Sequence, residues 1–510
     1  MTLTRSTFAL LLLVPSVASA QAPSDSLFNT DQVIDIQLTF AQPNYWDSLI
    51  AYYNEDLERQ LLASVTLTDL HGTYTYDSVG VRFKGNSSYG LPDKKSMKID
   101  FNEYVGGQKY HGVKKLNLNN GFNDPTLLRE KVFFDFCHDQ GVLAPRAVFG
   151  NVTINGELLG FYGVVEQVDT DFLDRWLDDN NGNMFKAGDQ FGGGAGGTTA
   201  ADLAWYGAAQ SGYTARYEQK TNEDLNDWSD LIDLIDVINN STTSQLEATL
   251  PGMWEWQSLL RSLAIDNLFA NLDGYINSAR NYYVYHDSTT LKWNWIKWDA
   301  NEAFGRYSGG QSNLLNLAPN YVANTRPLMT KIMNTPSFYQ AYLVEYCAAF
   351  DAFTNAQMDP HIDELAALIE PHVFVDPNKQ YTNAQFTTNL TSNITGGGGP
   401  GGNQTIYGLK SFINGRRSYL TPLLGCATIG MEESSLTGFV VAPNPCASEV
   451  RITLPEGAAI QGVALTDAAG RVLPVQRNAN TIDLSGMPVG LYILSVDLGS
   501  SVQRVRIVKE

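Results

Sequence analysis

Alternating apolar and polar positions mark the N-terminal part of the chain, from Val33 to Phe101. Val33 to Phe40 places an apolar residue at every second position, which predicts a half-buried strand. The same period recurs in Leu62 to Thr68, Ser78 to Lys84 and Ser96 to Phe101, with Gly- and Asp-containing breaks between the segments. The N-terminal part is therefore predicted to be rich in β-structure.

A helical period first appears in the segment from Pro125 to Gln140. Its apolar residues recur at helical spacing: Leu128, Val132, Phe133 and Phe136. Asp124 is the expected N-cap, Pro125 occupies the first helical position, and Gly141 follows the predicted end. Two further strands, Ala147 to Ile154 and Gly160 to Val168, flank a hairpin turn at Asn155-Gly156.

The pattern is mostly helical from Asn222 to about Gly425, and one predicted helix ends at Gly274. Near residue 430 it changes to short β segments separated by Gly and Pro turns, typical of a small β-sandwich. We therefore predict an α+β body over residues 30–425, a linker at 426–436 and an all-β domain at 437–510.

The first twenty residues resemble a secretory signal peptide. Arg5 precedes an apolar run from Phe8 to Val14, and Ala18-Ser19-Ala20 is a typical cleavage sequence. The run is shorter than the roughly 20 residues of a membrane-spanning helix, and no later stretch is long and apolar enough to span a bilayer. We expect export of the mature chain, residues 21 onward.

The charge and the numbers of cysteine and histidine argue against several classes of function. The 510 residues carry a formal charge of −20, which disfavours a nucleic-acid partner bound through its phosphates. Four dispersed cysteines allow one disulfide but no cysteine zinc site, and the six histidines lack the spacing of a zinc hydrolase. Two Gly-rich runs, Gly188 to Thr199 and Gly396 to Gly402, are predicted loops, since the first lacks the Lys-Ser/Thr pair of a phosphate-binding P-loop.

Three oxygen-bearing side chains surround one predicted hairpin. Asp273 follows a helix, Asn281 lies in a short loop, and Asp299 follows the returning strand. Protein kinases use this order for a catalytic aspartate, a metal-binding asparagine and a metal-binding aspartate, and hard oxygen ligands suit Mg²⁺. The alternative is that Asp273 caps a turn and Asp299 is an ordinary loop carboxylate.

Upstream residues extend the kinase-like order. Alternation places Lys98 on the strand face opposite Met97, where a nucleotide could lie. Glu130 is a candidate partner for such a lysine, with a surface helix charge as the alternative. Val164 to Asp169 ends a strand at the position of a kinase hinge, whose backbone would bind the adenine, and Glu166 in this segment is a candidate contact.

Together these segments resemble the spore coat protein H (CotH) kinase family over roughly Val33 to Gly425. The segments that carry the resemblance occur in order: Arg82-Phe-Lys-Gly-Asn-Ser-Ser, the Lys94-Lys95-Ser96 strand, Leu116-Asn-Leu-Asn-Asn, Leu128-Arg-Glu-Lys, Val165-Glu-Gln-Val-Asp, Gly182-Asn-Met-Phe-Lys186, Asn281-Tyr-Tyr-Val-Tyr and Ile296-Lys-Trp-Asp299.

The resemblance implies an atypical protein-kinase-like fold with a β-rich N-terminal lobe and a mostly helical C-terminal lobe. It implies a secreted enzyme that uses ATP and Mg²⁺ or Mn²⁺ to phosphorylate Ser or Thr in protein partners. By position, Asp273 matches the catalytic aspartate, and Asp299 and Asn281 match the metal ligands. The remaining candidates for nucleotide contacts are Arg82, Gly85, Asn86, Ser87, Ser88, Lys95, Lys98, Glu130 and Glu166.

Two questions stay open at this point. The choice between Lys95 and Lys98 for the phosphates is undecided, although the basic residues near 82–98 should gather in the nucleotide site. Asn301 stands where many relatives have a second acid, Trp-Asp-x-Asp. The chain could therefore be a nucleotide-binding pseudokinase, or a non-catalytic surface scaffold, in place of an active kinase.

The C-terminal residues carry a second resemblance. Ala442-Pro-Asn-Pro, Gly470-Arg471 and Gly490-Leu-Tyr occur in order, as in the C-terminal sorting domain of the type IX (Por) secretion system of Bacteroidetes. The alternative is a fibronectin-like adhesion module. A sorting domain implies a secreted or cell-surface protein that engages the type IX machinery, and cleavage of the tail would remove Cys446.

Overall fold

The computed structural model describes residues 24–55, 58–188, 200–323, 326–396, 404–426, 439–454, 458–467, 472–498 and 502–509. The predicted signal peptide and most of the two Gly-rich runs and of the predicted linker lie outside these residues.

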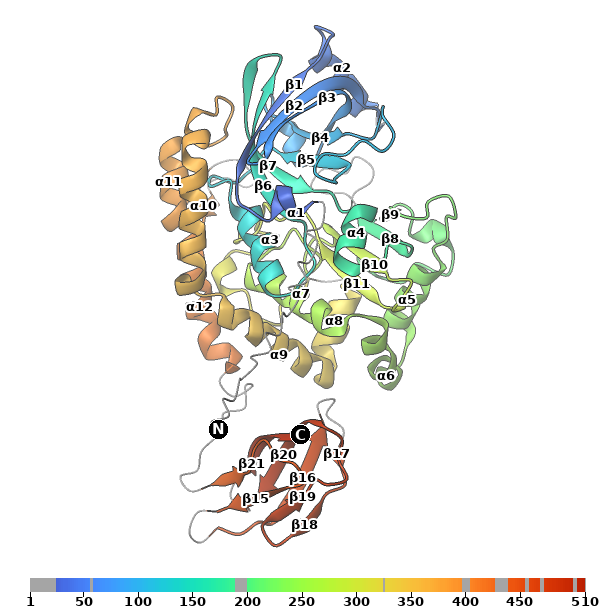
Figure 1. The fold of residues 1–510 in the computed structure, drawn as a ribbon, viewed down its shortest axis with the longest axis vertical. Helices are drawn as coiled ribbons and strands as arrows, with labels where there is room; N and C mark the ends of the chain where they lie inside the picture. Colours follow the sequence, from blue (N-terminus) through green and yellow to red (C-terminus); the bar gives the residue numbers. More distant parts are fainter. Residues whose placement is uncertain are drawn as a thin grey trace, which may run out of the picture.

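The N-terminal strands close into a barrel (Figure 1). Around the barrel the order is β1 (Val33–Thr39), β2 (Leu61–Asp69), β3 (Gly72–Lys84), β4 (Ser96–Asp100), β5 (Lys115–Asn119), β7 (Glu157–Glu166) and β6 (Ala147–Ile154). The pairs are antiparallel except β1 with β6. Alternate side chains of β1 are buried, as the sequence period predicts. Two helices accompany these strands, α1 (Asp25–Phe28) and α2 (Tyr45–Asn54), and α2 packs on β2 and β3.

Helices surround a second sheet below the barrel (Figure 1). Its order is β11 (Trp293–Lys297), β10 (Tyr282–His286), β8 (Asn183–Ala187) and β9 (Tyr217–Gln219). The helices of this part are α3 (Arg129–Asp139), α4 (Thr170–Leu177), α5 (Ser229–Asn240), α6 (Thr243–Met253), α7 (Trp256–Leu268), α8 (Pro327–Asn334), α9 (Pro336–Ala352), α10 (Asn355–Val375), α11 (Asn383–Thr391) and α12 (Leu409–Leu424). A short hairpin, β12 (Ile394–Gly396) with β13 (Gln404–Ile406), precedes α12. The body is therefore a mixed α+β structure, as predicted.

Helix α3 begins later than the sequence predicts. It starts at Arg129, and Asp124 is not its N-cap. The Asp124 carboxylate instead accepts hydrogen bonds from the backbone N–H groups of Thr126 and Arg129, both at 2.9 Å, and from the Arg129 guanidinium. Leu127 adopts a left-handed φ of 57°, which is incompatible with a helix. A buried arginine–aspartate loop therefore replaces the expected first turn.

Helix α7 ends at Leu268, before the predicted end at Gly274. Ala270 has a left-handed φ of 46°, and the side chain of Asn271 donates a hydrogen bond back to Asp266 at 3.0 Å. The chain therefore leaves the helix early, and Asp273 lies in an irregular loop.

Two polar contacts connect elements far apart in sequence. Lys94, before β4, forms a fully buried ion pair with Asp376 after α10 at 2.6 Å. His361 in α10 lies 2.8 Å from the carboxylate of Asp135 in α3, and this hydrogen bond raises the pKa of His361. These contacts hold the two ends of the α10 region against the segment before β4 and against α3.

A disulfide joins Cys347 in α9 to Cys426, two residues beyond the end of α12. This is the single bridge that four dispersed cysteines allow, and Cys137 is buried in the body. The bridge encloses a sequence separation of 79 residues and covalently attaches the C-terminal end of the body to its helical core.

The C-terminal strands form two four-stranded sheets, in the orders β14-β15-β19-β18 and β17-β16-β20-β21. The strands are β14 (Val440–Ala442), β15 (Glu449–Thr453), β16 (Gly462–Asp467), β17 (Val472–Leu473), β18 (Gln476–Asn478), β19 (Thr481–Asp483), β20 (Gly490–Asp497) and β21 (Val502–Lys509). Their buried residues form a hydrophobic cluster of their own. The sequence pattern predicts short β segments in this part of the chain, and the structure divides them into the strands given above.

Candidate functional site

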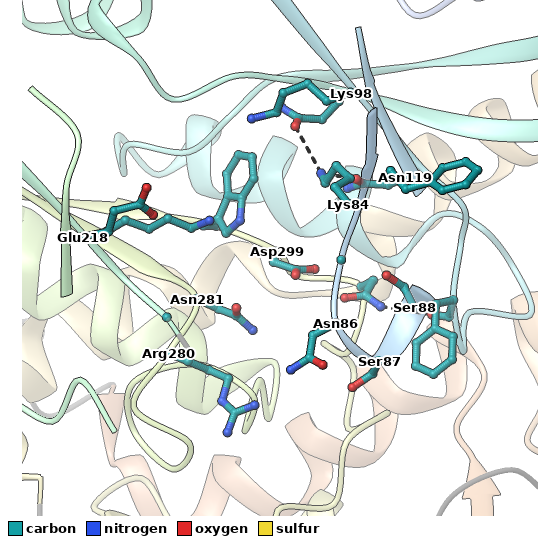
Figure 2. A pocket seen from close by; sticks show the side chains of 18 of the residues that line it. Lys84, Asn86, Ser87, Ser88, Lys98, Asn119, Glu218, Arg280, Asn281 and Asp299 are labelled. Carbon is teal, nitrogen blue, oxygen red and sulfur yellow. Dashed lines mark hydrogen bonds between the residues drawn. The ribbon is translucent and has the colours of Figure 1, made fainter. Parts of the chain in front are cut away.

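A cavity of about 680 Å³ lies between barrel strands β3 to β5 and the sheet β8 to β11. Polar and charged side chains from both parts line it, and Figure 2 shows them converging from opposite walls. Arg82 and Lys98 are adjacent on the barrel wall because the register of β3 and β4 pairs them directly. Asp273, Asn281 and Asp299 come from the other wall.

Asp273 and Asn281 form a hydrogen-bonded pair in the lining of this cavity. The Asn281 side chain donates from Nδ2 to the Asp273 carboxylate at 3.0 Å and to the Asp273 backbone carbonyl at 3.1 Å. Burial raises the pKa of Asp273 to about 7; Arg280 opposes the shift, and Glu302 and Asp299 add to it. A carboxylate with this pKa suits proton transfer near neutral pH.

Asp299 reaches the same cavity because of the β10–β11 hairpin. The register pairs Tyr282 with Lys297, so Asn281 and Asp299 lie just beyond the same end of the hairpin. Asp299 adopts a left-handed φ of 52°, which turns the chain after β11. Burial raises the pKa of Asp299, and the cations of Lys84 and Lys186 oppose this shift.

Lys84 is the lysine that faces Asp299, and sequence reasoning missed it. Its ammonium donates to the side-chain oxygens of Asn119 at 2.8 Å and Asn117 at 3.2 Å (Figure 2). Burial lowers the pKa of Lys84, against the opposing effect of Asp299 and Glu130. The strand period could have identified Lys84 as a site residue. Lys84 lies on the same face of β3 as Arg82 and directly precedes Gly85 of the loop.

Glu130 in α3 lies behind Lys84 and pairs with neither Lys95 nor Lys98. It accepts a hydrogen bond from Asn119 Nδ2 at 2.8 Å and lines a small adjoining cavity with Lys84. Burial and the nearby Asp299 raise the pKa of Glu130. Glu130 therefore influences Lys84 electrostatically, in the direction that raises its pKa, but forms no ion pair with a lysine among the described residues.

The loop Gly85 to Ser88 lines the cavity, as predicted, and the side chains of Asn86 and Ser87 are exposed (Figure 2). Gly85 has a φ of 90°, and a Cβ there would lie 2.1 Å from the Ser88 side-chain oxygen, so only glycine fits. The Tyr53 hydroxyl donates to the Gly85 carbonyl at 2.5 Å. Helix α2 thus fixes the loop from outside.

Lys95 does not line this cavity. Its ammonium donates to the Tyr89 carbonyl at 2.5 Å and lies 4.0 Å above the Tyr89 ring. Tyr89 in turn stacks on Tyr53 with ring centroids 3.5 Å apart. Lys95 therefore supports the loop, and of the two candidate lysines the structure places only Lys98 in the cavity.

Glu166 is also outside the cavity. Its carboxylate forms a buried ion pair with Arg146 at 2.5 Å. The next residue, Gln167, lines the cavity in its place and accepts a hydrogen bond from Asn117 at 3.2 Å. Within the predicted hinge segment, the structure therefore places Gln167, and not the candidate Glu166, in the cavity.

The cavity is also lined by charged residues that the sequence analysis did not name as site candidates. Lys186 of β8, Glu218 and Lys220 come from the second sheet and the segment after it, Arg280 from the loop before β10, and Glu302 from the segment after Asp299. The basic residues at 82–98 gather only in part, since Arg82, Lys84 and Lys98 line the cavity but Lys94 and Lys95 do not.

Asn301 lines the cavity near Asp299, and its amide donates to the Phe122 carbonyl at 3.0 Å. The neighbouring Glu302 is buried and accepts a hydrogen bond from Asn123 at 3.0 Å. Glu302 therefore places an acid directly after Asn301, and its carboxylate is held by the hydrogen bond from the Asn123 side chain.

The side-chain oxygens of Asp299 and Asn281 suit a hard divalent cation whose remaining ligands would be phosphate oxygens and water. Asp299 offers a carboxylate, and Asn281 commits its amide nitrogen to Asp273, which leaves its side-chain oxygen for a metal. The described residues contain no group of three or more His, Cys, Asp or Glu side chains that could hold a metal alone. Mg²⁺ characteristically takes few protein ligands and completes its shell with waters and nucleotide phosphates.

Comparison with known proteins identifies the family. The family model described as CotH kinase protein matches residues 81–420, more than half of the chain. The chain belongs to the CotH kinase protein family. It is 30% identical over 294 residues to inner spore coat protein H of Bacillus subtilis, covering 56% of this chain and 75% of that protein. The invasin CotH2 of Rhizopus delemar is 23% identical over 282 residues, covering 51% of this chain and 45% of the invasin.

Solved structures are similar to this CotH chain at a coarse level. A Shewanella oneidensis HipA–HipB toxin–antitoxin complex with operator DNA gives a TM-score of 0.30 at 10% identity, covering 76% of this chain and 72% of that chain. The Helicobacter pylori proinflammatory kinase CtkA gives a TM-score of 0.25 at 11% identity, covering 69% and 95%. Neither TM-score defines a shared fold in detail.

The tail matches a second family model, the secretion system C-terminal sorting domain, over residues 440–510. This match supports engagement of the type IX secretion machinery and a secreted or surface location. Within the described residues, none of the helices combines the length and apolar character needed to cross a membrane.

Proposed function

We propose that this protein is a secreted CotH-type protein kinase that transfers the γ-phosphate of ATP to Ser or Thr hydroxyls of extracellular or surface proteins. The observation that carries the proposal is the convergence of Asp273, Asn281, Asp299 and Lys84 on one cavity. Membership in the CotH kinase family supports phosphotransfer, and the sorting tail supports action outside the cell.

In the proposed mechanism the acceptor hydroxyl lies beside Asp273 in the cavity. The hydroxyl oxygen forms a bond to the γ-phosphorus, the bond from that phosphorus to the bridging β-phosphate oxygen breaks, and ADP leaves. The Asp273 carboxylate accepts the hydroxyl proton, and Asn281 holds this carboxylate in place through its 3.0 Å hydrogen bond.

The phosphates lie between Lys84 and the loop Gly85 to Ser88. The lysine neutralises phosphate charge from the barrel wall, while Asp299 and Asn281 would hold Mg²⁺ on the opposite wall. Bound Mg²⁺ would supply charge neutralisation for the transferring phosphoryl group. Positioning and charge stabilisation account for most catalysis in phosphoryl transfer.

A pseudokinase is the second candidate, and Asn301 favours it. The residue has an amide where many relatives have a carboxylate, and this amide is bonded to the Phe122 carbonyl. A pseudokinase would bind nucleotide without turnover. A non-catalytic scaffold would bind none.

Purified protein with labelled γ-phosphate, Mg²⁺ and a generic basic protein acceptor tests these candidates. Replacing the proposed base in Asp273→Asn should lower transfer about 10²- to 10⁴-fold, the usual contribution of a positioned base. The thermal shift given by Mg-ATP should persist in this variant, since Asp273 is not assigned to the nucleotide. Asp363→Asn, at an exposed position of α10, is the matched control and should transfer phosphate like the wild type.

Asp299→Asn separates the binding and catalytic roles. This variant should lose both transfer and the Mg-ATP thermal shift, because Asp299 is the proposed metal ligand. Nucleotide binding by a wild type that transfers no phosphate would establish the pseudokinase, and no thermal shift at all would establish the scaffold.

A further inference from the structure

An ion pair buried outside the cavity joins helix α7 to strand β11. The Lys297 ammonium lies 2.6 Å from the Asp266 carboxylate, and both side chains are 3% exposed. The ammonium also donates to the backbone carbonyl of Ser262, on the same helix, at 2.8 Å. Neither Lys297 nor Asp266 lines the cavity. Any effect of the pair on the reaction therefore has to act through other residues.

The second carboxylate oxygen of Asp266 holds the loop that carries Asp273. Asn271 donates from Nδ2 to this oxygen at 3.0 Å, and its backbone N–H donates to the Asp266 carbonyl at 2.8 Å. Gly274, directly after Asp273, donates from its backbone N–H to the Asn271 carbonyl at 3.3 Å. A Cβ at Gly274 would lie 3.4 Å from the Asp266 carboxylate, so the loop 270–274 packs directly on this network.

Lys297 has an equally direct connection to the proposed metal ligands. It pairs with Tyr282 in the β10–β11 register, and Tyr282 directly follows Asn281. Asp299 comes two residues after Lys297 along the chain. The hairpin is also held by β8, which pairs with β10, and by the backbone hydrogen bond from Lys297 to the Leu143 carbonyl at 2.9 Å. The metal ligands therefore lie at the end of a sheet, whereas the proposed base lies on an irregular loop.

A buried ion pair contributes more to geometry than to stability. Desolvation of both ions offsets most of their attraction, so apolar side chains of similar volume stabilise a fold at least as well. The pair nevertheless resists separation, because either ion left alone in the interior would be strongly destabilising. The contact between Lys297 and Asp266 therefore keeps the end of α7, and the loop attached to it, at a defined distance from β11.

We propose that Asp266 and Lys297 are positioning residues that set Asp273 at its working distance from Asn281 and Asp299. This inference rests on the proposed function, because it takes the roles of those three side chains from it. A displacement of about 1 Å in a catalytic site can lower the rate about 10²-fold. Loss of the pair should therefore lower kcat, while the hairpin and the nucleotide contacts on the barrel wall persist.

Two variants of the full chain test the proposal, with labelled Mg-ATP and the generic basic acceptor. Lys297→Met leaves the Asp266 carboxylate buried without its cation, so it should lower both kcat and the melting temperature. The double variant Asp266→Asn with Lys297→Met removes this uncompensated charge, keeps an acceptor oxygen for Asn271 and should recover most of the melting temperature. We expect kcat to stay about 10²-fold below the wild type in both variants. KM for Mg-ATP should change less than about threefold, which is less than the loss of one charged contact.

Lys94→Met is the matched control for lost stability. Lys94 and Asp376 form a second buried ion pair with the same 2.6 Å separation, and neither residue lines the cavity. This variant should lose melting temperature as Lys297→Met does, but it should keep the kcat of the wild type. If activity merely followed stability, kcat would fall in both single variants and return in the double variant.

Amide hydrogen exchange reports on the loop without a phosphate acceptor. The backbone N–H groups of Asn271 and Gly274 are hydrogen-bonded within the network. Exchange over residues 270–274 should therefore be faster in both Lys297 variants than in the wild type, and unchanged in Lys94→Met. Exchange over β10 should change little, since its pairing with β8 does not involve the ion pair.

The outcomes separate the positioning role from the kinase assignment. Recovery of kcat in the double variant, an equal loss in Lys94→Met, or unchanged exchange over 270–274 would overturn the positioning role and leave the kinase assignment standing. A rise in KM for Mg-ATP at unchanged kcat would also overturn it, because the pair would then support nucleotide binding. A wild type that transfers no phosphate would overturn the proposed function, and the positioning role with it, whatever the exchange shows.

Discussion

Lys84 provides the sharpest test of the site, because the sequence alone favours other lysines. In Lys84→Met the ammonium between Asp299 and the phosphate loop is lost, along with two hydrogen bonds to Asn119 and Asn117. A charge-assisted contact to a phosphate contributes about 1.5–3 kcal/mol. We therefore expect nucleotide affinity to fall about 10- to 150-fold.

Folding should change much less, since both asparagines line the cavity and can bond to water after the substitution. The unfolding free energy should fall by about 1 kcal/mol, the typical net value for hydrogen bonds of this kind. Isothermal titration with Mg-ATP gives the affinity, and urea denaturation gives the stability.

Lys95→Met is the discriminating comparison. Its ammonium is bound to the Tyr89 carbonyl outside the cavity, so its removal should change affinity less than about threefold, well below a charged contact. An affinity loss in Lys95→Met as large as in Lys84→Met would refute the assignment of the phosphate lysine and the loop geometry on which it rests.

Three further predictions concern stability. Lys94→Met leaves the Asp376 carboxylate buried without its cation and should lower the unfolding free energy in urea by about 3–5 kcal/mol. His361 has a raised pKa, so its contribution of about 0.5–1 kcal/mol is complete below pH of about 6.5 and lost as pH rises through its folded value; the stability difference between wild type and His361→Gln should be larger at acid pH than at alkaline pH, and an opposite trend would contradict the sign. Replacing Cys347 and Cys426 by serine should lower stability by about 2–4 kcal/mol, and reductant should affect only the wild type.

Much of the site could be predicted from the sequence because its order follows local rules. A hairpin brings the residues before its first strand and after its second strand to one end, which places Asn281 beside Asp299 whatever surrounds them. Strand alternation similarly directs Lys98 away from the barrel core. These inferences need only the period of a strand and the position of a turn.

The remaining features depend on contacts between distant segments. Lys95 is removed from the cavity by Tyr89, which stacks on Tyr53 of α2. Glu166 is removed by an ion pair with Arg146, twenty residues earlier. Periodicity indicates which face a side chain occupies, but it does not indicate which neighbour binds it.

The disulfide between Cys347 and Cys426 also has a mechanical consequence. A pull on the chain beyond residue 426 enters the body at the bridge and passes directly into α9, through a covalent bond. Helix α12 is therefore protected from being peeled away one turn at a time from its C-terminal end. The covalent path from Cys426 to Cys347 thus carries the load to α9 without first unwinding α12.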